Sequence, residues 1–129
     1  MEVRIEEIQR LHADCSWSID SRAAAEYAEF FGLDAVLRIE PAGREIAGRE
    51  ALERFAAESP AGVHLCGPVS LRPDGTTRTA FVFTNEATGG VLSGYYADSY
   101  SRDGSGRLVF ASREVRMTAP RTQDRAGDE

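Results

Sequence analysis

The second half of the chain consists of four alternating segments separated by short turn sequences, and this pattern limits the possible folds more than any other feature. The segments cover residues 63–72, 77–85, 91–102 and 108–117. The intervening sequences are Pro73-Asp74-Gly75, Thr88-Gly89-Gly90 and Asp103-Gly104-Ser105-Gly106. Such sequences are typical of tight turns between antiparallel strands, so the pattern predicts a four-stranded meander.

The first half has apolar residues at helical spacing instead. The apolar stripe formed by Ile5, Ile8, His12, Cys15 and Ile19 predicts a helix over residues 2–18. A second helix is expected to run through residues 23–31 and to end at a glycine, and a third to cover residues 49–58. Residues 35–40 and 45–47 flank a Pro-Ala-Gly turn and predict a short hairpin.

Helices followed by a block of strands indicate an α+β fold. We expect a cone-shaped, strongly curved antiparallel sheet wrapped around three N-terminal helices, with a ligand pocket at its open end. A length of 129 residues suits one domain. We expect that domain to cover residues 1–117 and a disordered tail to cover residues 118–129, which contain no large apolar residue.

The charge balance argues against nucleic acid or an anionic membrane surface as a partner. The 15 basic and 21 acidic residues give a net charge of −6, which leaves no basic excess to neutralise phosphates. No apolar segment approaches the roughly 18 residues that a membrane span needs. The N-terminus also lacks the apolar core of a signal peptide. We therefore expect a cytoplasmic protein.

The sequence contains no pattern that indicates a metal or a nucleotide cofactor. Cys15 and Cys66 lack a C-x-x-C spacing, and His12 and His64 form no local cluster of ligands. Glycine-rich phosphate loops and the nucleophile elbow of serine hydrolases are absent from the sequence. We expect no metal and no cofactor, and we interpret the two cysteines first as small buried apolar residues.

Alternation along the last two strands places two charged residues among apolar and aromatic neighbours. One face of the last strand is formed by Val109, Ala111, Arg113, Val115 and Met117. We interpret this mainly apolar face as the inward one, with Arg113 as its exception. In the preceding strand, Asp98 shares a face with Tyr96 and Tyr100. Asp98 and Arg113 are therefore candidates for a cross-strand ion pair, which is either structural or catalytic.

Three further residues have both a structural and a functional interpretation. Asp20, at the joint between the first two helices, is either a helix N-cap or a site residue. His64, at the start of the first long strand, is either a hydrogen-bonded structural histidine or a catalytic base. His12 either packs its ring against the sheet or lines the floor of the pocket.

Six segments of the chain follow one another in a characteristic order. They are Ile19-Asp20, Phe31-Gly32-Leu33-Asp34-Ala35-Val36, Gly48-Arg49-Glu50-Ala51-Leu52, His64-Leu65, Gly94-Tyr95-Tyr96-Ala97-Asp98 and Val109-Phe110-Ala111-Ser112-Arg113. In order and spacing they resemble the SnoaL-like branch of the nuclear-transport-factor-2-like superfamily, over residues 5–117. The resemblance implies a cystatin-like α+β barrel with a deep apolar pocket, which usually dimerises through the outer face of its sheet.

Members of this superfamily include polyketide cyclases, scytalone- and bile-acid-type dehydratases, ketosteroid isomerases, epoxide hydrolases and non-catalytic subunits. In the dehydratases, an aspartate at the end of the first helix supports a histidine on the first long strand, and Asp20 and His64 match those positions. Cys15 stands where the dehydratases carry a tyrosine, and Ala23 replaces a second aspartate. A thiol does not replace a phenol as a donor to a carbonyl oxygen, so the same dehydration is not implied.

We therefore expect a cofactor-free lyase, isomerase or cyclase that acts by general acid-base catalysis on a small apolar carbonyl compound, polyketide- or steroid-like. His64 would remove a proton next to the carbonyl, and Asp20 would orient His64. Arg113 or a tyrosine would stabilise the developing enolate. The candidate substrate-binding residues are Cys15, Tyr27, Tyr96, Asp98 and His12.

Two alternatives from other functional classes remain open. In the first, the Asp98–Arg113 pair activates water to open an epoxide. In the second, the pocket binds a small molecule, or the domain dimerises, without chemistry. We also expect a homodimer, because Leu92, Leu108 and Phe110 are predicted to make the outward face of the late strands apolar.

Overall fold

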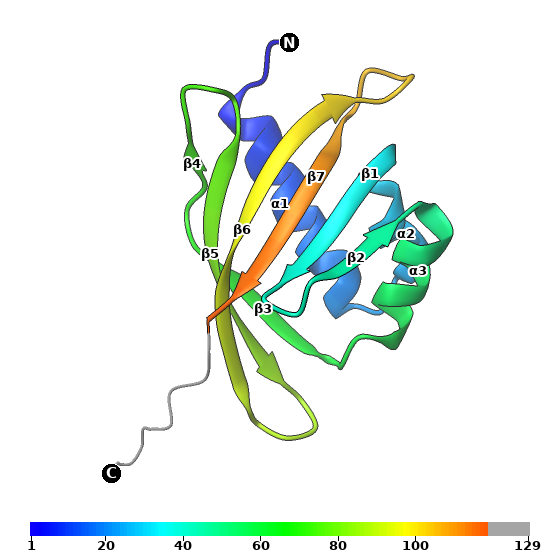
Figure 1. Cartoon of the computed structure of the whole chain (residues 1–129), viewed down its shortest axis with the longest axis vertical. Helices are drawn as coiled ribbons and strands as arrows, with labels where there is room; N and C mark the ends of the chain where they lie inside the picture. The colour runs from blue at the N-terminus through cyan, green and yellow to red at the C-terminus, as the bar shows by residue number, and fades with distance from the viewer. Residues whose placement is uncertain (119–129) are drawn as a thin grey trace.

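Three helices cover one face of a curved sheet in the computed structural model, which describes residues 1–118 (Figure 1). The helices are α1 (Ile5–Asp20), α2 (Ala24–Glu29) and α3 (Arg49–Glu58). The strands are β1 (Phe31–Glu40), β2 (Arg44–Ala47), β3 (Gly62–Cys66), β4 (Ser70–Leu71), β5 (Thr77–Asn85), β6 (Val91–Arg102) and β7 (Leu108–Met117). The predicted α+β class and the curved sheet packed on the helices are confirmed.

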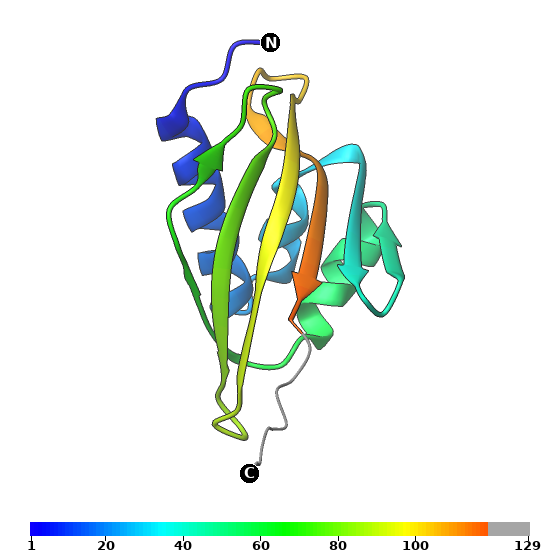
Figure 2. The same cartoon turned by 60° about the vertical axis from the view of Figure 1, so that its left-hand side comes forward.

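The sheet has the strand order β2-β1-β7-β6-β5-β3, and β4 pairs with β5. The predicted meander of late strands is present, because β5, β6 and β7 pair antiparallel in sequence order. One pair departs from the expected antiparallel sheet: β1 runs parallel to β7, so the hairpin of β1 and β2 extends the sheet beyond the last strand (Figure 2). The sheet is therefore mixed.

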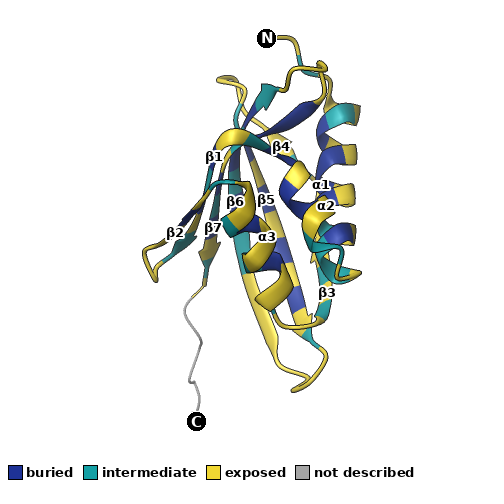
Figure 3. Ribbon diagram, turned by 90° about the vertical axis from the view of Figure 1, so that its right-hand side faces the viewer, coloured by how far each residue is buried: buried dark blue, intermediate teal, exposed yellow. Residues whose placement is uncertain are grey.

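Helix α1 forms because its apolar residues recur on one face, and that face packs onto the concave side of the sheet. Ile8, Leu11 and Cys15 are buried in the core, whereas Ile5, the first residue of the predicted stripe, is 36% exposed. Buried and exposed residues alternate along β5, as expected for a strand with one side in the core and one side in solvent (Figure 3). Within residues 1–118, no helix is both long enough and apolar enough to cross a membrane.

Three predicted boundaries differ from the structure. Helix α1 begins at Ile5 instead of residue 2 and reaches Asp20. The second helix ends at Glu29, and Phe31 begins β1, where it pairs with Phe110 in the sheet and packs against its ring at a centroid distance of 5.3 Å. The predicted strand over residues 63–72 is divided into β3 and β4, because Pro68 has no backbone N–H for the ladder.

The predicted inward face of β7 is correct for only half of the strand. Ser112 pairs with Ser99 and Phe110 pairs with Tyr100, so Ala111 is an extra residue and forms a β-bulge. Beyond the bulge, Arg113 faces the helices as predicted. Before the bulge, Phe110 belongs to the main hydrophobic cluster, whereas Val109 is buried outside that cluster.

The basis of the dimer prediction is therefore wrong. Leu108 and Phe110 are buried in the core, and Leu92 is partly exposed but lies on the inner face, where it lines the cavity described below. The exposed apolar residues on the outer face of β3, β5 and β6 are instead Val63, Leu65, Val82 and Val91, which we call the outer patch. The homodimer itself stays a prediction that rests on this patch. Of the predicted tail, Thr118 donates its backbone N–H to the Ser93 carbonyl oxygen at 3.0 Å, and residues 119–129 lie outside the described residues.

Candidate active site

The concave side of the sheet and the helices enclose an apolar cavity of about 460 Å³. Its walls come from α1, α2, α3 and the strands β1, β2, β3, β5, β6 and β7. Five predicted site residues line it: Cys15, Tyr27, His64, Tyr96 and Arg113. Asp20, His12 and Asp98 lie directly behind these residues and do not line the cavity.

Asp20 holds His64 at two points. One carboxylate oxygen, Oδ2, accepts the backbone N–H of His64 at 2.9 Å, and the other, Oδ1, lies 2.6 Å from ring Nδ1. The side chains are only 17% and 15% exposed, for His64 and Asp20 respectively. Because an ionised carboxylate only accepts hydrogen bonds, Nδ1 is the donor in this contact, and in the neutral tautomer that the contact favours Nε2 is the basic ring nitrogen.

The secondary structure explains why these two residues meet. Asp20 is the last residue of α1, and β3 runs beside that helix, with a second contact of 3.6 Å between Ser16 Oγ and Cys66 Sγ one turn earlier. The N-cap of α2 is Ala23, so Asp20 is not the helix cap of the structural interpretation. Packing against the Phe83 ring, at a centroid distance of 4.7 Å, fixes the other side of the imidazole.

Arg113 is a buried cation whose charge is balanced by the Asp98 carboxylate. Asp98 lies directly opposite it on β6, and the two form bidentate hydrogen bonds, Nε to Oδ1 at 2.8 Å and Nη2 to Oδ2 at 3.1 Å. The guanidinium carbon lies 3.8 Å from the ring centroid of Tyr96 and 4.2 Å from that of Phe110. Burial lowers the pKa of Arg113, but the attraction of Asp98 more than offsets it, so the net shift is upward and the cation persists.

The third nitrogen of this guanidinium, Nη1, makes no hydrogen bond with any residue in 1–118. Since Arg113 lines the cavity, Nη1 is the donor available to a bound molecule. The predicted cross-strand pair is thus present, and its geometry fixes the direction in which Arg113 donates.

The cavity also presents neutral groups. Burial raises the pKa of Tyr27 and of Tyr96, so both phenols stay protonated at neutral pH. Neither hydroxyl makes a hydrogen bond to another residue in the described part of the chain. Burial also raises the pKa of Cys15 to about 12, which makes this residue a thiol and a poor nucleophile. Cys66 is exposed, so the prediction of two buried cysteines is correct only for Cys15.

His12 belongs to a structural network behind the cavity. Its Nε2 lies 2.7 Å from the hydroxyl oxygen of Tyr100, which also bonds the Thr77 hydroxyl, and 3.4 Å from Asp98 Oδ2. Burial lowers the pKa of His12 to about 3, and nearby Arg113 adds to this effect. A neutral, 5% exposed ring in this position supports Asp98 and does not line the pocket floor.

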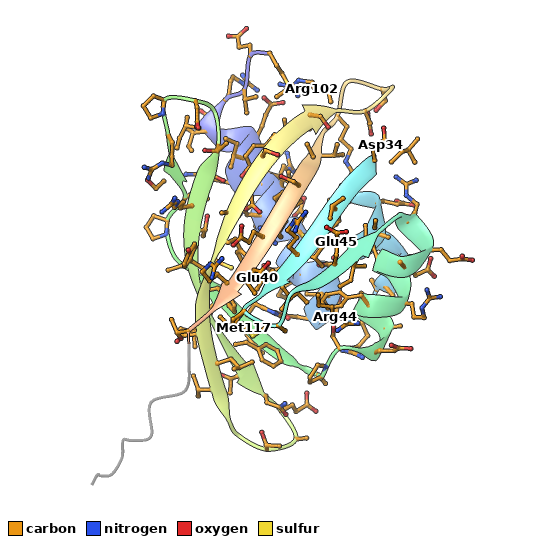
Figure 4. The ribbon with its side chains drawn as sticks, viewed as in Figure 1. Asp34, Glu40, Arg44, Glu45, Arg102 and Met117 are labelled. Atoms are coloured by element: carbon orange, nitrogen blue, oxygen red, sulfur yellow. The ribbon has the colours of Figure 1, made fainter. Side chains whose placement is uncertain are left out.

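Sequence reasoning missed the residues at the mouth of the cavity. The cavity is lined there by Arg44 from β2 and by Phe55 and Glu58 from α3. The side chain of Arg44 lies beside α3 (Figure 4). Alternation in the short strand β2 was the available signal, because it places Arg44 on the same face as Ile46. Within residues 1–118, no group of three or more His, Cys, Asp or Glu residues is placed to hold a metal ion.

Comparisons with known proteins agree with this architecture. A family model described as a SnoaL-like domain matches residues 4–114. The structure of an Asp-to-Asn variant of Rv3472 from Mycobacterium tuberculosis, described as of unknown function, is 28% identical with a TM-score of 0.79, over 90% of this chain and 72% of that chain. A Catenulispora acidiphila protein solved in complex with S-DNPA is 27% identical with a TM-score of 0.68, over 87% and 91% of the two chains.

ActVI-ORFA from Streptomyces coelicolor, at 20% identity and a TM-score of 0.67 over 87% of this chain and 95% of that one, shares the fold. A search of curated protein sequences found no match. The family model covers all three helices and all but the end of the last strand, including every residue of the cavity wall discussed above. The chain therefore belongs to the family of SnoaL-like domains.

Proposed function

We propose that the protein is a cofactor-free lyase, isomerase or cyclase that moves a proton on a small apolar carbonyl compound. One observation carries the proposal: the Asp20 carboxylate binds both the backbone and the ring of His64 in the wall of an apolar cavity. A histidine held in a single tautomer, with its basic nitrogen unpaired, is suited to general-base catalysis.

In the proposed reaction, His64 Nε2 accepts a proton from the carbon next to the carbonyl group. The positive charge that develops on the imidazole is stabilised by Asp20, which is 2.6 Å from Nδ1. The C–H bonding electrons move into the carbonyl, and negative charge develops on its oxygen. His64 then returns the proton to the same carbon, to another carbon or to a leaving group, which corresponds to exchange, isomerisation or elimination.

We assign stabilisation of the enolate oxygen to two donors. Strands β3 and β7 are separated by three ladder spacings, roughly 14 Å at the backbone, so His64 and Arg113 reach inward from opposite walls. Tyr96 lies on β6 between them, in contact with Arg113 and stacked at 4.5 Å on Phe81, which neighbours His64. Its neutral phenol and Arg113 Nη1 are the proposed oxyanion donors.

The comparisons support a small-molecule ligand. A structure 27% identical to this chain was solved in complex with S-DNPA. The proposal extends small-molecule binding to this cavity, which is lined mainly by aliphatic and aromatic side chains with few polar groups.

Hydrogen exchange at carbon tests the proposed base without knowledge of the natural substrate. The probe is 2-tetralone, a bicyclic ketone with acidic C–H groups, incubated in D₂O and followed by ¹H NMR. The protein should accelerate deuterium incorporation next to the carbonyl. His64→Gln should lower this acceleration about a hundredfold, the usual size of a general-base contribution, and Asp20→Asn should lower it less.

Asp14→Asn is the matched control, because Asp14 is an exposed carboxylate on the same helix and does not line the cavity. It should exchange the probe at the wild-type rate. If His64→Gln binds 2-tetralone and accelerates exchange as well as the wild type, His64 is not the base. If the wild type binds the probe without accelerating exchange, the non-catalytic binding module becomes the better interpretation.

The geometry gives less support to epoxide opening. Both oxygens of Asp98 accept hydrogen bonds from Arg113, its side chain is fully buried, and it does not line the cavity. A carboxylate that activates water must reach that water. Asp98 is better placed as the group that orients Arg113.

A further inference from the structure

An arginine occupies an inward position of the hairpin at the cavity mouth. In the β1–β2 register, Leu37 lies opposite Ile46, and both are buried. Ile39 lies opposite Arg44 on the same face, and both line the cavity. A position that alternation assigns to an apolar residue therefore carries a cation.

The guanidinium of Arg44 has an apolar support but no counter-ion. Its central carbon lies 5.4 Å from the ring centroid of Phe55. No carboxylate in residues 1–118 lies within 4.0 Å of it, and the adjacent Glu45 is already paired with Arg38 at 2.8 Å on the outer face. An arginine stacked on an aromatic ring keeps its N–H groups free in the plane of the guanidinium, where they can bind a carboxylate.

Among the described residues that line the cavity, Arg44 is the arginine without a carboxylate partner. Arg113 is neutralised by Asp98 in the interior. Glu58 also lines the mouth, without an ion pair to Arg44 within 4.0 Å. The chain as a whole carries a net charge of −6 and repels anions at long range, so a preference for an anion must come from a local contact.

We propose that Arg44 selects substrates that carry a carboxylate at the end opposite the reacting carbonyl. The apolar ring system fills the cavity between Phe55 and Tyr96, and the carboxylate stays at the mouth, where Arg44 binds it and bulk water still solvates it. This inference rests on the proposed function only in placing the substrate in this cavity. It identifies the substrate class as amphiphilic ring acids.

Equilibrium binding tests the inference with two probes of the same shape and different charge. The probes are 2-naphthoic acid, ionised at pH 7.5, and 2-naphthamide, measured by isothermal titration calorimetry at low salt. The wild type should bind the acid about fivefold more tightly than the amide, as expected for one partly exposed ion pair. The ratio should decrease at high salt, which screens such pairs.

Three variants test whether Arg44 causes the preference for the acid over the amide. Arg44→Gln should lower the acid-to-amide ratio to about one and leave amide binding unchanged. Arg54→Gln, a matched control that removes an exposed charge next to Phe55 but outside the cavity lining, should keep the wild-type ratio. Glu58→Gln should raise the ratio, because it removes a negative charge from the mouth.

Equal affinity of the wild type for acid and amide would overturn the inference. An unchanged ratio in Arg44→Gln would do the same. Neither probe has an acidic C–H group next to a ketone, so these results do not depend on catalysis. The His64→Gln exchange experiment can fail while the Arg44 preference holds, and the reverse is equally possible.

Discussion

Replacing Asp98 with asparagine would leave the Arg113 guanidinium buried without a counter-charge. The side chains are 4% exposed for Arg113 and 0% for Asp98, and no other carboxylate in residues 1–118 pairs with this arginine. Tyr96 and Phe110 occupy the two faces of the guanidinium, so water cannot hydrate it from those directions. The asparagine amide retains the shape of the carboxylate but supplies no charge.

The magnitude follows from the burial. Removing one partner of a buried ion pair costs about 3–5 kcal/mol, because the remaining charge loses its compensation. For a domain whose total stability is about 5–15 kcal/mol, this is a large fraction. With an m-value of about 1.5 kcal/mol/M in urea, the unfolding midpoint should decrease by about 2–3 M.

Urea titration followed by far-UV circular dichroism measures this difference. The matched control is Glu114→Gln on the same strand, because Glu114 pairs with Arg116 at 2.8 Å in a much more exposed ion pair. The control should lose less than about 1 kcal/mol. The double variant Asp98→Asn with Arg113→Met should recover most of the lost stability, since it leaves no buried charge. A loss in Asp98→Asn no larger than that of the control would refute the reasoning.

Three further predictions concern acid stability, backbone packing and assembly. Burial lowers the pKa of His12 to about 3, so between about pH 6.5 and pH 3 the unfolded chain binds a proton that the folded chain excludes. The free energy of unfolding should therefore fall by up to about 1.4 kcal/mol for each unit by which the pH is lowered in this range. His12→Phe should lose this pH dependence of the urea midpoint. Gly62→Ala should destabilise by about 1–3 kcal/mol in thermal or urea unfolding, because a Cβ would collide with the backbone carbonyl oxygen of Thr84 and with the Phe83 ring, whereas Gly104→Ala, with open space around it, should be nearly neutral. Leu65→Lys in the outer patch should convert the expected homodimer to a monomer in light scattering, and a wild type that is already monomeric at high concentration would contradict the assembly prediction.

The contacts that could be predicted from the sequence are those with a simple geometric origin. Asp98 and Arg113 lie on consecutive strands joined by a short turn, so alternation made them candidates for a cross-strand pair, and the structure pairs them directly. Asp20 and His64 are 44 residues apart, and no local pattern joins them. Only the resemblance to the SnoaL-like dehydratases predicted that these two residues interact. In the structure, their side chains are 2.6 Å apart.

Other contacts depend on tertiary packing that no window of the sequence contains. The hydrogen bond between His12 and Tyr100 joins residues 88 positions apart on different elements. The sequence pattern predicts Phe31 as the end of a helix, because the residues before it favour a helix. Pairing with β7 and ring packing against Phe110 draw it into the sheet instead, which is tertiary context overriding local propensity.

The β-bulge at Ala111 is a tertiary feature of this kind, and it determines how Arg113 is enclosed. In a regular strand, Phe110 and Arg113 are three positions apart and point to opposite faces. The extra residue on β7 reverses the alternation once, so both side chains point toward the helices. Only then can the Phe110 ring cover one side of the guanidinium at 4.2 Å while Tyr96 covers the other at 3.8 Å. This enclosure holds Arg113 in the single orientation that Asp98 selects, with Nη1 left for a ligand. Strict period-two counting therefore gives Phe110 an outward face, although Phe110 is fully buried, and the error falls at the irregular part of β7 that encloses the guanidinium.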